Sequence, residues 1–368
     1  MQRFSVSLLK RMLEIYSPTG TEAKLSRFLL QRMRVLGGRT YIDNAGNVIG
    51  EFGEGNPVIL LCGHMDTIPG MIPVRIEKGR LYGRGAVDAK TSLAAMVVAA
   101  SALLKEKFSG KLFVAGVVDE EGKGQGIKQL IEDGLRADYA IFGEPSGVEQ
   151  ITIAYKGSLN VKVSVETVSG HSSAPWLFEN AVERAFEAYK LLRLINFPLE
   201  KRGSKFYSVS STLTKIAGGS LSSTVPSKCS FRVDFRVPPK ISPEQLLDEV
   251  KRIISDYGNG KPNINLKVEA LSACDPYEAD SDSILIRSLS WAIRMVRDKP
   301  ATWVRKTGTG DMNLYGASEK IPIVTYGAGE SSLDHTSNES VDLSEYEDSI
   351  RVLRKCIRRL VELHNKRK

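Results

Sequence analysis

Residues 58–66 read VILLCGHMD, an apolar run that ends in a histidine and an aspartate. A continuous apolar run of this length is typical of a strand that is buried on both faces of a parallel sheet. In open α/β sheets, ligands bind beyond the carboxyl ends of the strands. We therefore predict a strand at residues 58–62 and a functional site at His64 and Asp66.

Two later apolar runs end in the same way. Residues 112–118 precede the acidic segment DEEG at 119–122, and residues 139–142 precede Gly143-Glu144-Pro145. The stretch 90–104 between the first two strands has the apolar spacing of a helix. Strands that alternate with helices indicate an α/β fold, so we expect the polar ends of the three strands to lie close together.

The pattern changes after about residue 158 and changes back after about residue 273. The intervening segment alternates strands with two amphipathic helices, and we place these elements at residues 159–168, 180–194, 207–216, 230–237 and 243–257. The α/β pattern then resumes with a helix at 282–297, a strand at 321–326 and a closing helix at 344–364. We therefore predict a discontinuous catalytic domain, residues 1–157 and 273–368, interrupted by an α+β domain at residues 158–272. A chain of 368 residues is long enough for two domains.

The composition excludes several classes of site. Cys62, Cys229, Cys274 and Cys356 are scattered without a CxxC pair, which argues against a disulfide framework or a thiolate zinc site. The N-terminus lacks the apolar run of a signal peptide, and the longest mostly apolar stretch, residues 92–104, is too short to cross a bilayer. We expect a cytoplasmic protein in which any metal is bound by histidines and carboxylates.

The chain is basic, with 51 Lys and Arg against 43 Asp and Glu and a net charge of +8. Such a charge suits nucleic acid, a membrane surface or an acidic protein partner. Aromatic residues make up only 7% and are not interleaved with basic runs, and no nucleic-acid-binding motif occurs. Nucleic acid is therefore the weaker option, whereas an acidic partner stays open. The alternative is a solvated surface, rich in Lys, Arg and Glu, of the thermophilic kind.

The polar segments contain the residue types that a two-metal hydrolytic site requires, namely several imidazole and carboxylate ligands and a free carboxylate that moves protons. In chain order these candidates are His64, Asp66, Asp88 in GRGAVDAK at 83–90, Glu120, Glu121, Glu144 and His335. Asp66 can orient the imidazole of His64 from behind. A single HxD or Glu-Glu pair is usually a surface feature, but the ordered set points to a metal-dependent hydrolase.

Taken in order, the motifs HMD, GRGAVDAK, DEEG, FGEP and LDHT resemble the dizinc aminoacylase, carboxypeptidase and desuccinylase metallopeptidase family. The resemblance covers nearly the whole chain and includes GHSSAP at 170–175, which is similar to the GHxAxP motif of the inserted domain of that family. It implies a zinc-peptidase-like α/β catalytic domain with an inserted α+β lid and dimerisation domain, and hence a homodimer. Thr91 is a departure, because the family often has glycine at this position.

The same resemblance implies a role for each motif residue. Two zinc ions, for which cobalt can substitute, would be bound by His64, Asp88 and Glu144 and by Asp88, Glu121 and His335. Asp88 would bridge the two ions, and its peptide bond to Ala89 would be cis.

Two further roles come from the resemblance. Glu120 would be the general base that transfers a proton from water to the leaving nitrogen. His171 would stabilise the oxyanion from the inserted domain of the partner subunit. The structural alternative for His171 is a strand-end histidine that is hydrogen-bonded to a turn.

Substrate contacts are expected at four further residues. Residues 308–311, GTGD, are predicted to open a helix, where the backbone N–H groups near Thr309 could bind a substrate carboxylate. Arg236 resembles the substrate-carboxylate arginine of the family, and Lys156 ends a strand at the domain hinge; for both, the alternative is a structural ion pair. Glu330 lies five residues before His335 and could accept a substrate ammonium group, or instead cap its own loop or pair with a nearby lysine.

Within the family, KTGTGDMN at 306–313 and GAGESSLDHT at 327–336 resemble hydrolases that release lysine or ornithine from a small acidic amino-group carrier protein in lysine and arginine biosynthesis. The implied reaction cleaves an amide at the γ-carboxyl of the terminal glutamate of the carrier. The closing helix gathers Arg351, Arg354, Lys355, Arg358 and Arg359 on one side, which would favour an acidic partner. The alternatives are an acetylornithine deacetylase or succinyl-diaminopimelate desuccinylase, an aminoacylase, a dipeptidase, or a non-enzymatic scaffold, which the intact residue set disfavours.

Overall fold

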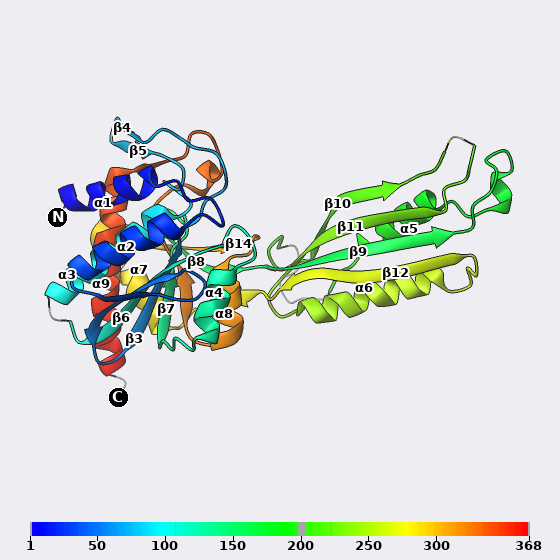
Figure 1. The fold of residues 1–368 in the computed structure, drawn as a ribbon. Helices are drawn as coiled ribbons and strands as arrows, with labels where there is room; N and C mark the ends of the chain where they lie inside the picture. Colours follow the sequence, from blue (N-terminus) through cyan, green and yellow to red (C-terminus); the bar gives the residue numbers. More distant parts are fainter. Residues whose placement is uncertain (1, 107, 198–203, 222, 367–368) are drawn as a thin grey trace. The chain divides into compact units, whose positions relative to one another are not determined.

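The computed structural model describes residues 2–106, 108–197, 204–221 and 223–366, and the chain divides into two compact units (Figure 1). The first unit comprises Met1–Ala154, Ala279–Arg305 and Gly310–Lys368, and the second comprises Tyr155–Glu278 and Lys306–Thr309. The second unit therefore interrupts the first, and it includes Lys306–Thr309, which lies in the segment predicted for the catalytic domain. The mixed α/β class is as predicted.

The first unit is built on a twisted sheet with the order β1-β2-β6-β3-β7-β15-β8, in which β14 also pairs with β8. Strands β6, β3, β7 and β15 run parallel, whereas β1, β2 and β8 are antiparallel to their neighbours. The strands are β1 (Arg39–Ile42), β2 (Val48–Glu54), β3 (Val58–His64), β6 (Gly110–Val117), β7 (Tyr139–Phe142), β8 (Gln150–Tyr155), β14 (Thr302–Lys306) and β15 (Ile323–Thr325). The three apolar runs of the sequence are thus buried strands at the centre of the sheet.

Helices cover this sheet, and a small second sheet joins two distant segments. The helices are α1 (Gln2–Glu14), α2 (Ala23–Val35), α3 (Lys90–Lys105), α4 (Gln125–Glu132), α7 (Ile284–Arg297), α8 (Asp311–Glu319) and α9 (Leu343–Asn365), with a 3-10 turn at Ser331–Leu333. Helix α3 contacts β3, α1 and α9 and is buried along almost its whole length, as its apolar sequence requires. The small sheet has the order β16-β5-β4, formed by Ser340–Asp342, Arg80–Tyr82 and Arg75–Glu77.

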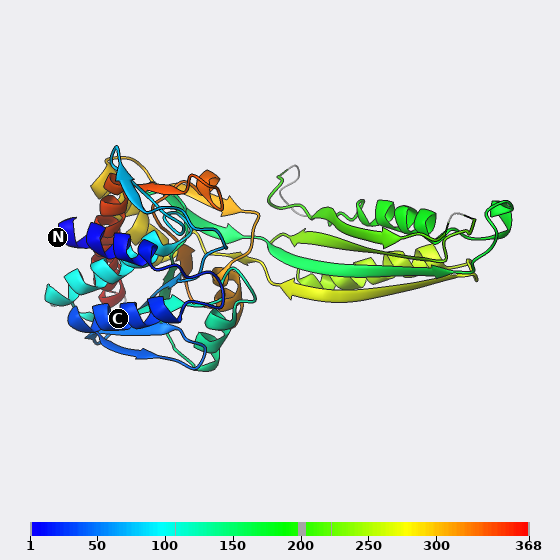
Figure 2. The same ribbon diagram turned by 45° about the horizontal axis from the view of Figure 1, so that its top comes forward.

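The second unit is an antiparallel sheet with the order β10-β11-β9-β12, covered on one face by α5 and α6 (Figure 2). Its elements are β9 (Gly157–Thr167), η1 (Pro175–Leu177), α5 (Ala181–Leu192), β10 (Ser210–Gly218), β11 (Lys228–Val237), α6 (Pro243–Gly258), β12 (Ile264–Cys274) and β13 (Tyr277–Glu278). Alternate residues of β9 and β11 face the two helices, because successive side chains of a strand point to opposite faces. Strand β12 was not predicted.

Among the described residues, every helix is too short or too polar to span a lipid bilayer.

Candidate metal centre

Five residues from separate segments converge at the carboxyl edge of the parallel strands. His64 ends β3, Glu121 follows β6 and Glu144 follows β7, while Asp88 precedes α3 and His335 follows the 3-10 turn. They form two groups that share Asp88: His64, Asp88 and Glu144, and Asp88, Glu121 and His335. Within each group, one ligand atom per residue lies within 4.8 Å of the others.

Asp88 turns a different oxygen to each histidine. Its Oδ1 lies 3.0 Å from Nε2 of His64, and its Oδ2 lies 3.1 Å from Nε2 of His335. Glu144 Oε1 is 3.8 Å from the first imidazole, and Glu121 Oε1 is 2.8 Å from the second. A carboxylate between two imidazoles in this way could ligate two metal ions, one beside each histidine. The peptide bond between Asp88 and Ala89 is cis, as predicted.

The carboxylates and imidazoles of the centre shift one another's pKa values. Burial raises the pKa of Asp88, but hydrogen bonds from His335 and His64 outweigh burial and hold this pKa far below its ordinary value. Burial lowers the pKa of His64, whereas the neighbouring carboxylates of Asp66 and Asp88 raise it, and the net result lies well above the ordinary value. The hydrogen bond to Asp88 raises the pKa of His335 to about 9. Three carboxylates and two imidazoles in one cluster form a donor set that fits two divalent metal ions.

Asp66 is fully buried behind the centre and contacts it through both its backbone carbonyl and its carboxylate. The Nδ1–H of His64 donates to the backbone carbonyl of Asp66 at 2.9 Å, whereas the carboxylate Oδ1 is 3.5 Å from the same nitrogen. This hydrogen bond fixes the ring so that Nε2 of His64, the nitrogen that could ligate a metal ion, faces Asp88. The carboxylate of Asp66 instead accepts the backbone N–H groups of Glu120 and Glu121, at 3.1 and 3.0 Å, and the hydroxyl of Thr19 at 2.9 Å. Asp66 thus fixes the backbone of the Glu120–Glu121 pair.

Glu120 belongs to neither ligand group. Burial is the main cause that raises its pKa well above the ordinary value, followed by the charge of Glu144. A Cβ atom at Gly310 would lie 3.4 Å from Oε1 of Glu120, an ordinary van der Waals distance, so this carboxyl lies beside the start of α8. Glu120 is therefore a carboxyl with a raised pKa that lies outside the two candidate ligand groups.

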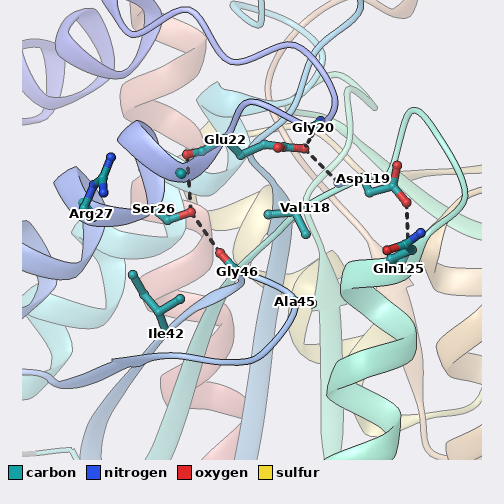
Figure 3. A pocket seen from close by; sticks show the side chains of 11 residues that line it. Gly20, Glu22, Ser26, Arg27, Ile42, Ala45, Gly46, Val118, Asp119 and Gln125 are labelled. Atoms are coloured by element: carbon teal, nitrogen blue, oxygen red, sulfur yellow. Dashed lines mark hydrogen bonds between the residues drawn. The ribbon is translucent and has the colours of Figure 1, made fainter.

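Val118 and Asp119, which precede Glu120, line a cavity of about 540 Å³ (Figure 3). Glu22 lines this cavity, and its carboxylate accepts the backbone N–H groups of Gly20 at 3.0 Å and Asp119 at 3.2 Å. Asp119 has a positive φ of 62°, and its own carboxylate accepts the N–H groups of Lys123 and Gln125. These hydrogen bonds to the cavity-lining carboxylates therefore fix the backbone of the loop that precedes Glu120.

Most of the predicted substrate residues lie in the second unit. Arg236 forms an ion pair with Asp234 at 2.9 Å, and a structural ion pair was the alternative to a substrate contact for this residue. Lys156 is buried, and its Nζ donates to the carbonyl of Ser208 at 2.6 Å. Burial, and then the charge of Arg236, lowers the pKa of Lys156. Thr309 is exposed immediately before Gly310, the N-cap of α8.

His171 and Glu330 are both exposed. The Nδ1 of His171 accepts the backbone N–H of Ser173 at 3.2 Å and lies 2.8 Å from the Ser173 hydroxyl. An Nδ1 that accepts leaves the proton on Nε2, so the outer nitrogen of the ring is a donor. Glu330 accepts the hydroxyl of Ser332 at 2.7 Å and lines a cavity of about 690 Å³ in the first unit together with Arg80 and Arg297.

Two supporting residues were missed by sequence reasoning. Thr19 donates to Asp66, and the buried carboxylate of Glu339 accepts the backbone N–H groups of Val87 and Asp88. Glu339 bonds to main-chain atoms, and Thr19 is far from Asp66 in the chain. Neither contact leaves a pattern of side-chain types in the sequence.

Comparison with known proteins gives consistent matches over almost the whole chain. The model of peptidase family M20/M25/M40 matches residues 60–359. The chain is 37% identical over 352 residues to a Pyrococcus furiosus protein provisionally named LysW-lysine/LysW-ornithine hydrolase, with 96% of each chain covered. It is 33% identical over 360 residues to the LysW-lysine hydrolase of Deinococcus radiodurans, again with 96% of each covered. A solved structure, a dinuclear metal-binding peptidase of the M20 family from Bacillus subtilis, has the same fold, with a TM-score of 0.78, 13% identity and 98% of each chain covered.

Proposed function

The chain belongs to peptidase family M20/M25/M40, and we propose that it is a dizinc hydrolase that releases lysine or ornithine from an acidic amino-group carrier protein. The observation that carries this proposal is the pair of ligand groups that share Asp88, with Glu120 beside them and outside both. The relatives named above act, by their names, on lysine or ornithine linked to LysW. We propose a substrate of the same class for this chain.

The residues of the centre fit zinc, because imidazole nitrogens and carboxylate oxygens from several segments can bind it while leaving a position open for water or substrate. Two bound zinc ions would supply Lewis acidity toward the amide carbonyl and would lower the pKa of water. Glu120 would accept the proton of the attacking water and pass it to the leaving nitrogen, so the same residue acts first as a base and then as an acid. The products are a free carboxylate on the carrier and a free amino acid.

We propose that the enzyme works as a homodimer in the cytoplasm and that the second unit forms the lid and the dimer contact. Large apolar side chains lie exposed on this unit: Trp176 is 78% exposed, Leu221 86% and Leu177 67%. Exposed apolar side chains of this size support an association surface on this unit.

The substrate assignment is tested by comparing rates on four classes of compound. Purified, zinc-loaded enzyme is assayed with carrier-linked lysine, carrier-linked ornithine, acetylornithine and succinyl-diaminopimelate. We expect kcat/KM to be highest for a carrier-linked substrate. A higher kcat/KM for an acylated free amino acid would favour the deacylase or desuccinylase alternative, which shares the same metal centre.

The basic residues of α9 are less available to a partner than their spacing suggests. Arg354 and Arg358 both pair with Glu106, Arg351 pairs with Asp348, and Arg359 pairs with Glu362. The predicted positive stripe is therefore only partly neutralised, because Glu106 is shared by two arginines and Asp348 also pairs with Arg297. The net charge of +8 gives further support to an acidic partner.

We expect rising salt to lower kcat/KM for carrier-linked lysine more steeply than for a small γ-glutamyl-lysine analogue. Attraction between a basic enzyme and an acidic protein is long-ranged and is screened within about 10 Å at 0.1 M salt. The measurement is the slope of log(kcat/KM) against log of the salt concentration for both substrates. Equal slopes would remove the electrostatic argument for an acidic carrier.

Glu330→Gln tests whether Glu330 binds the ammonium group of the lysine or ornithine that is released. We expect kcat/KM for lysine-bearing substrate to fall by about tenfold relative to a neutral isostere, because a lost charge-assisted hydrogen bond typically has an effect of this order. Ser332→Ala is the control, since it removes the hydroxyl that Glu330 accepts but keeps the carboxylate. If Glu330→Gln left the preference for lysine over the neutral isostere unchanged, Glu330 would only stabilise its own loop.

A further inference from the structure

Glu339 is a buried carboxylate that contacts the turn of the bridging aspartate. Its side chain is 1% exposed, and its Oε1 accepts the backbone N–H groups of Val87 at 2.9 Å and Asp88 at 3.0 Å. Its Oε2 pairs with Nη1 of Arg84 at 2.9 Å. One carboxylate thus fixes two successive N–H groups and is itself held in place by a guanidinium.

The same residue belongs to the segment that carries His335. Glu339 lies four residues after His335 and directly before β16, which pairs with β5 in antiparallel register, Ser340 opposite Tyr82. The backbone N–H of Gly83 donates to the carbonyl of Glu339 at 3.3 Å, and Arg80 donates to the carbonyl of Ser340 at 2.9 Å. The segment after His335 is therefore joined to the segment before Asp88 by backbone and side-chain bonds.

We propose that Glu339 is a positioning residue that holds the Asp88 carboxylate in register with His335 and so sets the affinity of the second metal position, formed by Asp88, Glu121 and His335. This inference rests on the proposed metal centre and deepens it. The first position depends on Asp88 as well, but its histidine is oriented by Asp66 and does not lie on the segment of Glu339. Loosening the Glu339 contacts thus changes the second position more than the first. Residues that support metal ligands typically contribute a factor of 10 to 100 in metal affinity.

Glutamine cannot replace Glu339 while Arg84 is present. With its amide oxygen toward Val87 and Asp88, the NH₂ group would face the guanidinium of Arg84, so two donors would meet. With the oxygen toward Arg84, the NH₂ group would face the two backbone N–H groups. The charged neighbour favours the second orientation, in which both contacts to the Asp88 turn are lost.

The test is a metal titration that needs no substrate. Metal-free protein is titrated with Co²⁺ in competition with a chelator, and the visible spectrum of the bound ion reports its coordination. We expect two binding steps in the wild type, and in Glu339→Gln one step weakened by about tenfold or more with an altered spectrum. Wild-type affinity in both steps of Glu339→Gln would overturn the inference.

Arg84→Gln is the matched control, because it breaks the same buried ion pair but keeps both N–H contacts of Glu339. We expect Arg84→Gln to lower the melting temperature about as much as Glu339→Gln does, and to bind Co²⁺ like the wild type. The double variant Glu339→Gln/Arg84→Gln frees the amide to turn its oxygen to the Asp88 turn, so we expect it to regain most of the lost affinity. Equal loss of affinity in Arg84→Gln would mean that the ion pair acts only through stability, and the inference would fail.

Two further outcomes are distinguished by the same titration. If Glu339→Gln does not fold, Glu339→Asp keeps the charge but withdraws the carboxylate from the Val87 and Asp88 N–H groups, and the same weakened step is expected; wild-type affinity in this variant would refute the proposal. Wild-type protein that bound fewer than two ions would overturn the metal centre itself, and with it the proposed function.

Discussion

Glu120→Gln should retain both metal ions and lower kcat by about a hundred- to ten-thousandfold. The amide has the shape of the carboxyl but cannot accept a proton from water. Glu120 lies outside both ligand groups, and its backbone N–H is held by Asp66, so the substitution leaves the ligand geometry in place. The KM for a carrier-linked substrate should change much less than kcat, because the proton transfer occurs only in the transition state.

The neighbouring residue provides the matched control. Glu121→Gln makes the same chemical change one position along the same loop, but at a residue that lies 2.8 Å from His335 in the second ligand group. We expect Glu121→Gln to lose metal and Glu120→Gln to keep it, as measured by elemental analysis of dialysed protein. Loss of metal from Glu120→Gln would identify Glu120 as a ligand and leave the centre without its general base.

The centre of the fold could be predicted from sequence because its strands are buried on both faces. Residues 58–62 and 139–142 are continuous apolar runs, and both are strands of the parallel sheet with little change in their ends. Strand β12 (Ile264–Cys274) lies at the edge of the other sheet, and most of its residues are exposed or only half buried, so its apolar signal is weak. Whether such a segment forms an edge strand depends largely on the strand with which it pairs. For β12 that strand is β9, which lies about a hundred residues earlier in the chain.

The convergence of the candidate ligands was also predictable, because the carboxyl ends of neighbouring parallel strands meet at one edge of the sheet even when the strands are distant in the chain. The individual hydrogen bonds were not predictable in this way. His64 donates to the backbone carbonyl of Asp66 rather than to its carboxylate, a choice made by about half an ångström of geometry within a two-residue spacing. On α9, helical spacing places the basic residues apart from the buried Leu353, Ile357 and Leu360, but Glu106, which pairs with two of the arginines, comes from the far end of α3.

The last prediction concerns His171, whose proposed role requires a second copy of the chain. Its Nδ1 accepts from Ser173, so its Nε2–H is available as a donor to a developing oxyanion. We expect His171→Ala to lower kcat by about a hundred- to a thousandfold, the usual effect of removing one oxyanion donor, with metal content unchanged. Ser173→Ala should have a smaller effect, because it keeps the imidazole and the backbone N–H that fixes its tautomer.

A mixture of two inactive variants tests whether the imidazole comes from the partner subunit. In a dimer of one His171→Ala chain and one Glu120→Gln chain, the first chain contributes an intact base and the second an intact histidine, so one of the two sites would be complete. Random exchange of subunits places half of the chains in such mixed dimers, so activity should rise to about a quarter of the wild-type value, whereas each variant alone stays inactive. Mixed dimers that form, as shown by differently tagged subunits, but remain inactive would mean that each chain completes its own site.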